Sequence, residues 1–404
     1  MYSETDMGIE DSTSDKKPEK EVIKPFRGFL YSHRLKDKIS DLICPPYDVI
    51  DEKMQRELFE KSEFNYVRIV LSPYGHNHAT ESLKKFLQEK IIERSDEESI
   101  YVLVQSFYDG EGKKFDFVGI ISLVSCDAKI VEHERTKPKV VEDRIELLQK
   151  TGFNTCPIFL MTEGKNIRNW YESSKSSFKK IFDFSYVSYE YEIKIFGSLF
   201  SSQDFSIISK LQDKEFLIAD GHHRFNAIKE VYYQKKSEKF FMAFIADESS
   251  GFFIMPFLRE VESKWKEYLK SLNFDFILSR QKVRLPQNID IFALAKNFDA
   301  DFLFIFDDEA EKLVLRKLFE KNHLQVLHDY ILKNIEVNFE ANMLKSLRKI
   351  QGGDIGCAIF PRPLSIQEIW EIVRKKSILP PKSTYFWPKI PSGLVLNKTN
   401  FSEL

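Results

Sequence analysis

The segment at residues 215–228 constrains the fold of this chain more than any other part of the sequence. Residues 216–219 form a short apolar run that predicts a buried strand, and Asp220-Gly221 is a turn signal. Apolar side chains recur at helical spacing from Phe225, which predicts a helix that starts near there. The predicted strand passes directly into the predicted helix. The helix N-terminus therefore contains Gly221, His222, His223 and Arg224.

This position favours the binding of an anion. The free backbone N–H groups and the positive dipole end of a first helical turn bind phosphate readily. Gly221 lets the backbone approach such a ligand, and Arg224 can donate two parallel hydrogen bonds. His222 and His223 can accept or donate protons near neutral pH. A hairpin turn with two surface histidines explains the same residues without a ligand.

A second polar segment follows a pair of prolines. Pro45-Pro46 fixes an extended backbone, because proline restricts its own φ and the conformation of the residue before it. Tyr47 and Asp48 are therefore held on a stiff segment. Asp48 is compatible with a site and equally with a turn or a cap.

A charged loop at residues 131–139 is the third candidate, and it contains a proline. It concentrates proton donors, proton acceptors and phosphate-binding cations, namely His133, Glu134, Arg135, Thr136 and Lys139. Loops on a rigid scaffold often hold functional sites, whereas charge density alone favours a solvated surface. Asp143 and Arg144 follow in the predicted first turn of a helix, where an acid offsets the helix dipole and an arginine can pair with it.

The remaining patterns predict an α/β chain. A hairpin is predicted at residues 99–107 and 115–124. Periodicity and cap signals predict strands at 65–70, 239–246, 251–257, 301–306 and 355–360, and helices at 51–61, 80–94, 309–322 and 365–375. The closing stretch at 380–389 holds a cation and two hydroxyls that either complete an anion pocket or belong to a strap on the surface, namely Lys382, Ser383 and Thr384.

Composition limits the classes of function. With 60 basic and 62 acidic residues, the chain has no global field that would draw it to nucleic acid or to a membrane. No apolar run reaches about 18 residues, so no transmembrane helix is predicted, and the polar N-terminus shows no signal peptide. The four cysteines form no C-x-x-C pair and are predicted to be reduced core thiols of a cytoplasmic protein. Residues 1–22 are polar and aperiodic, which predicts a disordered tail.

Five separated motifs together resemble a known family. Their order is Phe26-Arg-Gly28, Pro45-Pro-Tyr-Asp-Val-Ile50, His133-Glu-Arg-Thr136 with Asp143-Arg144, Asp220-Gly-His-His-Arg224, and Pro381-Lys-Ser-Thr-Tyr-Phe386 with Pro388-Lys389. In this order they resemble the domain-of-unknown-function family 1015 from about residue 24 to residue 395. The fourth motif resembles the phosphate-binding motif of the ParB and sulfiredoxin superfamily, which includes free-serine kinases that use ADP.

The resemblance implies an α/β fold with a mixed-sheet core of the ParB/sulfiredoxin type at residues 23–260. That core would carry a large insertion at about residues 80–200, and a C-terminal α/β appendage with a closing strap would follow at residues 261–404. It implies a phosphoryl-transfer or phosphate-ester enzyme that acts on a small metabolite such as serine or phosphoserine. ADP or ATP and Mg²⁺ are the cofactors this hypothesis names, and a small phosphorylated metabolite or nucleotide is the partner.

Residue roles follow from combining the resemblance with the chemistry of the side chains. The candidate catalytic residues are His222, His223, Asp48 and Glu134. The two carboxylates among them are also the candidate Mg²⁺ ligands. The candidate phosphate- or substrate-binding residues are Asp220, Gly221, Arg224, Tyr47, His133, Thr136, Lys139, Arg144, Lys382, Ser383 and Thr384.

Two positions depart from the family pattern. Leu258 stands where many members carry a histidine in a Pro-x-His-Arg sequence, and residues 339–342 replace an expected Tyr-x-x-Asp pattern. The alternative hypothesis is therefore a non-catalytic sensor that binds a nucleotide or a phosphorylated amino acid and reports it to a partner. Nucleic-acid binding is disfavoured, because the net charge is near neutral and no helix-turn-helix is evident.

Overall fold

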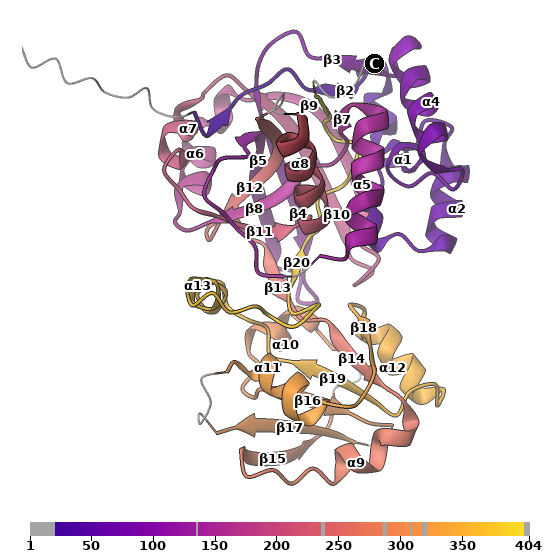
Figure 1. Cartoon of the computed structure of the whole chain (residues 1–404), viewed down its shortest axis with the longest axis vertical. Helices are drawn as coiled ribbons and strands as arrows, with labels where there is room; N and C mark the ends of the chain where they lie inside the picture. Colours follow the sequence, from indigo (N-terminus) through magenta and orange to yellow (C-terminus); the bar gives the residue numbers. More distant parts are fainter. Residues whose placement is uncertain are drawn as a thin grey trace, which may run out of the picture.

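The computed structural model describes residues 21–134, 136–235, 239–285, 289–307, 309–316 and 321–399. Almost all of the tail predicted at residues 1–22 lies outside these ranges, as does Arg135. Figure 1 shows two sheets in separate halves of the molecule, each accompanied by its own helices. Within the described ranges, every helix is too short or too polar to span a lipid bilayer.

The larger sheet has nine strands among the described residues. They are β1 (Ile23–Lys24), β4 (Ile100–Tyr108), β5 (Lys114–Ser125), β6 (Ile130–Val131), β8 (Ile158–Thr162), β9 (Lys179–Val187), β10 (Lys194–Ser202), β11 (Phe216–Asp220) and β12 (Phe240–Asp247). Their order is β6-β11-β8-β12-β5-β4-β10-β9, with β1 paired to β5. Strand β8 runs parallel to β12 and antiparallel to β11, which confirms the predicted mixed sheet.

Both faces of this sheet are covered, so its strands are apolar on both sides. In β11, Phe216 and Ile218 pack in one apolar cluster, whereas Leu217 and Ala219 pack in the other. The first cluster includes side chains of α5 (Pro138–Thr151), α6 (Asn166–Ser174), α7 (Ser206–Leu211) and α8 (His222–Lys235). The second includes side chains of α1 (Ile39–Leu42), α3 (Val67–Val70) and α4 (Gly75–Gln88).

The smaller sheet is antiparallel and confirms the predicted C-terminal α/β region. Its strands are β14 (Leu258–Val261), β15 (Ile277–Val283), β16 (Phe302–Ile305), β17 (Ala310–Leu315), β18 (Val337–Glu340) and β19 (Cys357–Pro361), in the order β15-β17-β16-β19-β14-β18. The helices in this part of the chain are α9 (Lys266–Lys270), α10 (Ile291–Lys296), α11 (His323–Val326), α12 (Met343–Gln351) and α13 (Ile366–Arg374).

The last described strands pair outside the two large sheets, in two sheets of two strands each. Strand β20 (Tyr385–Trp387) pairs with β13 (Phe253–Met255), and β21 (Asn397–Lys398) pairs with β7 (Phe153–Asn154). All three side chains of β20 are at most 2% exposed, so this part of the closing segment is buried rather than lying on the surface. The division predicted between residues 260 and 261 stays a prediction, and it falls inside β14.

Several local predictions are confirmed. Strands β4 and β5 form the predicted hairpin. Helix α2 (Glu52–Lys61) begins after Asp51, whose carboxylate accepts a hydrogen bond from the N–H of Met54 at 2.8 Å. Helix α13 begins after Ser365, and Ser365 and Glu368 form a reciprocal capping box. Cys44, Cys156 and Cys357 are buried thiols, and Cys126 is partly buried.

The strand predicted at residues 65–70 is wrong, because α3 occupies residues 67–70. The amide side chain of Asn65 accepts a hydrogen bond from the N–H of Val67 at 2.9 Å and donates one to the carbonyl of Asp41 at 2.8 Å. A side chain that binds its own backbone two residues ahead turns the chain. The apolar side chains that suggested a strand are buried as one helical turn instead.

Three other local predictions are corrected, two in their boundaries and one in the type of element. The helix predicted at 80–94 is α4, which ends at Gln88, and β3 (Ile92–Arg94) follows and pairs with β2 (Phe29–Tyr31). Within the helix predicted at 309–322, the described residues contain β17, because that segment pairs with β15 and β16. Asp143 and Arg144 lie in the second turn of α5, because that helix begins earlier, at Pro138.

Candidate functional site

The junction of β11 and α8 has the geometry of an anion site. Strand β11 ends at Asp220 and α8 begins at His222, which confirms the predicted strand, turn and helix. Gly221 has φ +95°, and a Cβ atom there would lie 3.0 Å from Nη2 of Arg224. A helical hydrogen bond runs from the N–H of Phe225 to the carbonyl of Gly221 at 2.9 Å. The three preceding N–H groups therefore belong to the first helical turn, whose amides have no intrahelical partner.

A cavity of about 250 Å³ surrounds this junction. Segments far apart in sequence form its walls, including residues 47–49, the β9–β10 hairpin, residues 339–341 and the closing segment. The cavity brings together the predicted site residues Tyr47, Asp48, Glu134, Asp220, Gly221, His222, His223, Arg224, Lys382 and Thr384. Four of the five sequence motifs thus meet there, whereas the first motif, at residues 26–28, does not line the cavity.

Asp220 is held between two cations. One of its carboxylate oxygens lies 3.4 Å from Nη2 of Arg224, and the other lies 3.4 Å from Nζ of Lys389. Burial alone would raise the pKa of Asp220, but the charges of Lys389 and Arg224 outweigh it and lower that pKa. Arg224 also donates a hydrogen bond to the carbonyl of Pro157, while no acceptor for its Nε is found in the described part of the chain.

Two buried histidines face each other beside this ion cluster. The ring centroids of His133 and His222 are 4.8 Å apart, and the ring planes meet at 72°. Nε2 of His133 lies 3.0 Å from the hydroxyl of Thr384. Burial lowers the pKa of His133 to about 4. Burial and the neighbouring His133 lower the pKa of His222 well below its usual value. Nε2 of His222 is buried and has no hydrogen-bond partner among the described residues.

We expect both rings to remain neutral at pH 6, where free histidine is largely protonated. The ¹⁵N chemical shifts of the imidazoles would report this directly, with free histidine in the same buffer as the reference. Because the folded pKa values lie below the unfolded value, the unfolded chain binds protons first. The free energy of unfolding should therefore fall as the pH drops from about 6.5 to about 4. A protonated His133 or His222 at pH 6 would contradict this assignment.

The other predicted catalytic groups differ in their surroundings. Nε2 of His223 accepts a hydrogen bond from the N–H of Lys137 at 3.1 Å, and burial lowers the pKa of His223. Burial raises the pKa of Glu134 in spite of the nearby Lys382 charge. Asp48 is exposed at the rim of the cavity. Of the two histidines that line the cavity, His222 is therefore the one with a buried ring nitrogen that has no partner among the described residues.

Besides His133 and Arg144, three predicted residues lie outside the cavity lining. The hydroxyl of Thr136 accepts a hydrogen bond from the side-chain amide of Asn226 in α8 at 3.1 Å. Lys139 is exposed in the first turn of α5. The hydroxyl of Ser383 donates to the carbonyl of Pro380 at 2.6 Å, which closes a turn. These three residues were predicted from the charge and hydroxyl groups of their segments. Neither property determines in which direction a side chain points.

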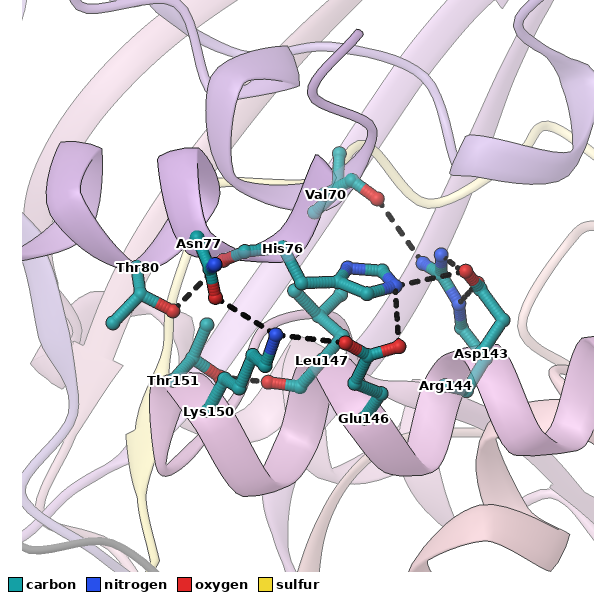
Figure 2. A network of polar contacts seen from close by, with 10 residues as sticks. All are labelled: Val70, His76, Asn77, Thr80, Asp143, Arg144, Glu146, Leu147, Lys150 and Thr151. Atoms are coloured by element: carbon teal, nitrogen blue, oxygen red, sulfur yellow. Dashed lines mark hydrogen bonds and ion pairs between the residues drawn. The ribbon is translucent and has the colours of Figure 1, made fainter. Parts of the chain in front are cut away.

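Arg144 does not line the cavity, but it contacts Tyr47, which does. Its guanidinium lies 4.2 Å from the centre of the Tyr47 ring and donates to the carbonyl of Val70 at 3.0 Å. Figure 2 shows how Asp143 orients this guanidinium and also contacts Nε2 of His76, at 2.8 Å. The network joins α4 to α5 and places a cation against the far face of Tyr47. Burial and the nearby Asp48 raise the pKa of Tyr47 to about 12.

We expect the Asp143→Asn variant to be less stable than the wild type at neutral pH, by an amount that shrinks in acid. Burial would raise the pKa of Asp143, but the Arg144 charge and hydrogen bonds from Arg144 and His76 lower it. The ionised carboxylate therefore stabilises the fold above about pH 4, and this contribution is lost as the pH falls further. Urea unfolding between about pH 7 and pH 3 would measure the difference. Glu142→Gln, at the exposed neighbouring position, is the matched control. A difference in unfolding free energy between wild type and Asp143→Asn that stays constant with pH would contradict the prediction.

A comparison with known families decides the relationship of the chain. The family described as "Protein of unknown function (DUF1015)" matches residues 23–337. The chain belongs to this family. No curated protein sequence matches the DUF1015 chain.

Solved structures with a similar arrangement share little sequence with the DUF1015 chain. A free serine kinase in complex with AMP is 14% identical, with a TM-score of 0.35 and coverage of 68% of this chain and 92% of that chain. SbnI with a C-terminal truncation, from Staphylococcus aureus, is 14% identical, with a TM-score of 0.38 and coverage of 67% and 85%. A conserved hypothetical protein from Pyrococcus furiosus is 17% identical, with a TM-score of 0.35 and coverage of 67% and 93%.

Sequence reasoning missed several cavity residues of this DUF1015 protein. Lys389 binds Asp220, and its membership of the fifth motif was the available signal. Glu190 and Tyr189 come from the tip of the β9–β10 hairpin, where no motif marked them. Glu190 is 6% exposed and accepts a hydrogen bond from the hydroxyl of Tyr385. The cavity thus contains more carboxylates than its motifs suggested.

The two departures from the DUF1015 pattern have structural explanations. Leu258 is 1% exposed and packs with Leu303 and Phe360 in the apolar core of the smaller sheet, away from the cavity lining. Asn342 caps α12 by accepting a hydrogen bond from the N–H of Lys345 at 3.0 Å. Neither side chain contributes a polar group to the cavity.

A resident Mg²⁺ does not fit the side chains that are present. Within the described ranges, no group of three or more histidine, cysteine, aspartate or glutamate side chains could hold a metal ion. Glu134 and Asp48 line the same cavity but do not form a metal site by themselves. Mg²⁺ often binds through one or two carboxylates together with substrate phosphates, so a role for these two residues would require a bound nucleotide.

Proposed function

We propose that the DUF1015 chain binds a phosphorylated small metabolite or a nucleotide at the N-terminus of α8 and catalyses phosphoryl transfer or phosphate-ester cleavage there. Serine and phosphoserine are the metabolites we propose to test first. The observation that carries this proposal is the position of His222, a buried imidazole in the first turn of α8 beside the Asp220–Lys389 ion pair, whose Nε2 has no partner among the described residues. Proton acceptor and anion site are thus combined in one cavity.

The residues divide into those that hold phosphate and those that handle protons. The first-turn N–H groups of α8 and the cations Lys382 and Lys389 would neutralise phosphate oxygens. In the transfer step, a substrate oxygen forms a bond to phosphorus while the bond to the leaving oxygen breaks. Nε2 of His222 would take the proton of the attacking hydroxyl or water. Phosphoryl transfer depends mainly on positioning and charge stabilisation, which this arrangement supplies without a covalent intermediate.

The binding part of the proposal is tested by calorimetric titration of the protein with ADP and with phosphoserine, each with and without Mg²⁺. Replacing Lys382 with Gln should weaken the binding of at least one of these ligands by about tenfold or more, because a charged hydrogen bond is lost. Lys139→Gln is the matched control, since Lys139 is exposed outside the cavity and should leave affinity unchanged. Equal affinities for wild type and Lys382→Gln would refute the assignment of Lys382.

A non-catalytic sensor is the second candidate function, and Leu258 favours it. The position of the family histidine is filled by a leucine that packs in the apolar core of the smaller sheet. If that histidine takes part in turnover in other members, this chain would retain ligand binding and lack the reaction. Saturable binding of ADP or phosphoserine without any product in the presence of Mg²⁺ would support the sensor.

A further inference from the structure

A second cavity of about 230 Å³ adjoins the phosphate cavity. Tyr189, Glu190 and Lys389 line both cavities, so they form the wall between them. Two chain segments also pass from one cavity to the other. The proline pair at 45–46 lines the second cavity and the next three residues line the first, and in the closing segment Trp387 lines the second and Tyr385 the first. The two cavities therefore adjoin at these three side chains, as an apolar and a polar compartment.

The second cavity is mainly apolar. Aliphatic side chains, proline rings and aromatic rings form most of its wall, among them Ile43, Met54, Leu58, Tyr186 and Pro391. Apart from the shared Glu190 and Lys389, its charged residue is Lys61, whose ammonium already contacts the carbonyl of Ser40 and the carboxylate of Asp41. A purely polar ligand would find few free partners there.

One polar group in this wall lacks a partner. Trp387 is fully buried, and its indole N–H has no acceptor in the described part of the chain. A buried donor without an acceptor costs free energy. A ligand with a hydrogen-bond acceptor beside Trp387 would remove that cost. A planar ring with an acceptor atom would satisfy the indole and pack against the aromatic and proline walls.

The sizes of the two cavities support one ligand that occupies both. Small-molecule sites commonly measure about 300–1,000 Å³, and each cavity alone is below that range. Taken together they fall inside it. The polar compartment contains the helix N-terminus and the cations, and the apolar compartment contains the aromatic wall.

We propose that the apolar cavity is the subsite for the planar aromatic group of a phosphate ester whose phosphate lies at the N-terminus of α8. Nucleoside phosphates belong to this chemical class. This inference rests on the proposed function, because it places the phosphate in the same cavity. Tyr189 and Glu190 at the hairpin tip then determine specificity, since they form the wall that the ligand must pass.

The test fills the apolar cavity and leaves the phosphate cavity untouched. Val187 lines only the apolar cavity and is 61% exposed, so the variant Val187→Trp should fold while its larger ring blocks the subsite. Phe196 lies on the other strand of the same hairpin, is 44% exposed and lines neither cavity, so Phe196→Trp is the matched control. The probes for calorimetric titration are AMP, ADP, pyrophosphate and ribose 5-phosphate.

We expect the wild type to bind AMP or ADP at least about tenfold more tightly than ribose 5-phosphate. Val187→Trp should lose that advantage and keep its affinity for pyrophosphate, while Phe196→Trp should match the wild type. Equal binding of AMP and ribose 5-phosphate by the wild type, or full affinity of Val187→Trp for AMP and ADP, would overturn the aromatic subsite. Failure of the wild type to bind any of the four probes would instead overturn the proposed phosphate site.

Discussion

Replacing Arg224 with alanine is expected to lower the free energy of unfolding by about 3–5 kcal/mol, because it leaves a largely buried carboxylate without one of its two cations. The Asp220 side chain is only 17% exposed and depends on Arg224 and Lys389 for charge compensation. The guanidinium also packs over Gly221 and donates to the carbonyl of Pro157. Urea unfolding of wild type and variant at pH 7 would measure the change.

A double-mutant cycle separates the ion pair from the other contacts of Arg224. In the Asp220→Asn background, removal of the guanidinium no longer strands a charge, so Arg224→Ala should cost less there. The difference should be about 0.5–3 kcal/mol, as expected for residues in direct contact. Additive effects of the two substitutions would show that Arg224 does not compensate Asp220. Because Arg224 stabilises the fold, a loss of ligand binding in Arg224→Ala alone would not prove that it contacts phosphate.

Replacing His222 with asparagine is expected to lower the rate of phosphoryl transfer by about 10²–10⁴-fold, which is the usual contribution of a general acid or base. His222 is the buried imidazole at the cavity whose Nε2 has no partner among the described residues. Since its pKa lies well below the usual value, the ring stays in the proton-accepting form throughout the neutral range. The rate should therefore not fall through protonation of His222 between about pH 8 and pH 6.

His223→Asn is the matched control for this prediction. Its Nε2 already accepts a hydrogen bond from the backbone of Lys137, so its loss should disturb the rate far less. Ligand affinity should change little in His222→Asn, because the phosphate is held by the helix amides and the lysines. Equal losses of rate in the two variants would contradict the assignment of His222 as the proton acceptor.

The parts of the fold that the sequence predicted well are those with strong local signals. The β11–α8 junction combines a buried apolar run, an Asp-Gly turn and helical spacing from Phe225, and each signal agrees with the others. The N-cap of α13 is similar, because Ser365 and Glu368 form a capping box. Residues 310–315 and 67–70 were predicted wrongly, since short apolar runs fit a strand and a helix equally well and distant partners decide between them.

The cavity residues also fall into those that local sequence signals predict and those that only the folded chain reveals. Tyr47, Glu134 and Lys382 were recognised because their residue types suit the chemistry and they lie on stiff or charged loops. Glu190 could not be recognised, because its partner Tyr385 lies 195 residues away and only the closed fold brings the two together. Ser383 had a suitable residue type, but its hydroxyl turns towards its own backbone.

³¹P NMR of the purified protein with Mg²⁺ shows directly whether the cavity at the N-terminus of α8 catalyses phosphoryl transfer. One sample contains phosphoserine, and others contain serine with ADP or with ATP. His222→Asn and His223→Asn are measured in parallel under the same conditions.

We expect new resonances from inorganic phosphate or from phosphoserine with wild type and with His223→Asn, and none above background with His222→Asn. Resonances that persist unchanged in His222→Asn would contradict the catalytic site. Unchanged spectra in every mixture, with the protein folded and ADP or phosphoserine bound, would contradict the phosphoryl-transfer reaction and support the sensor.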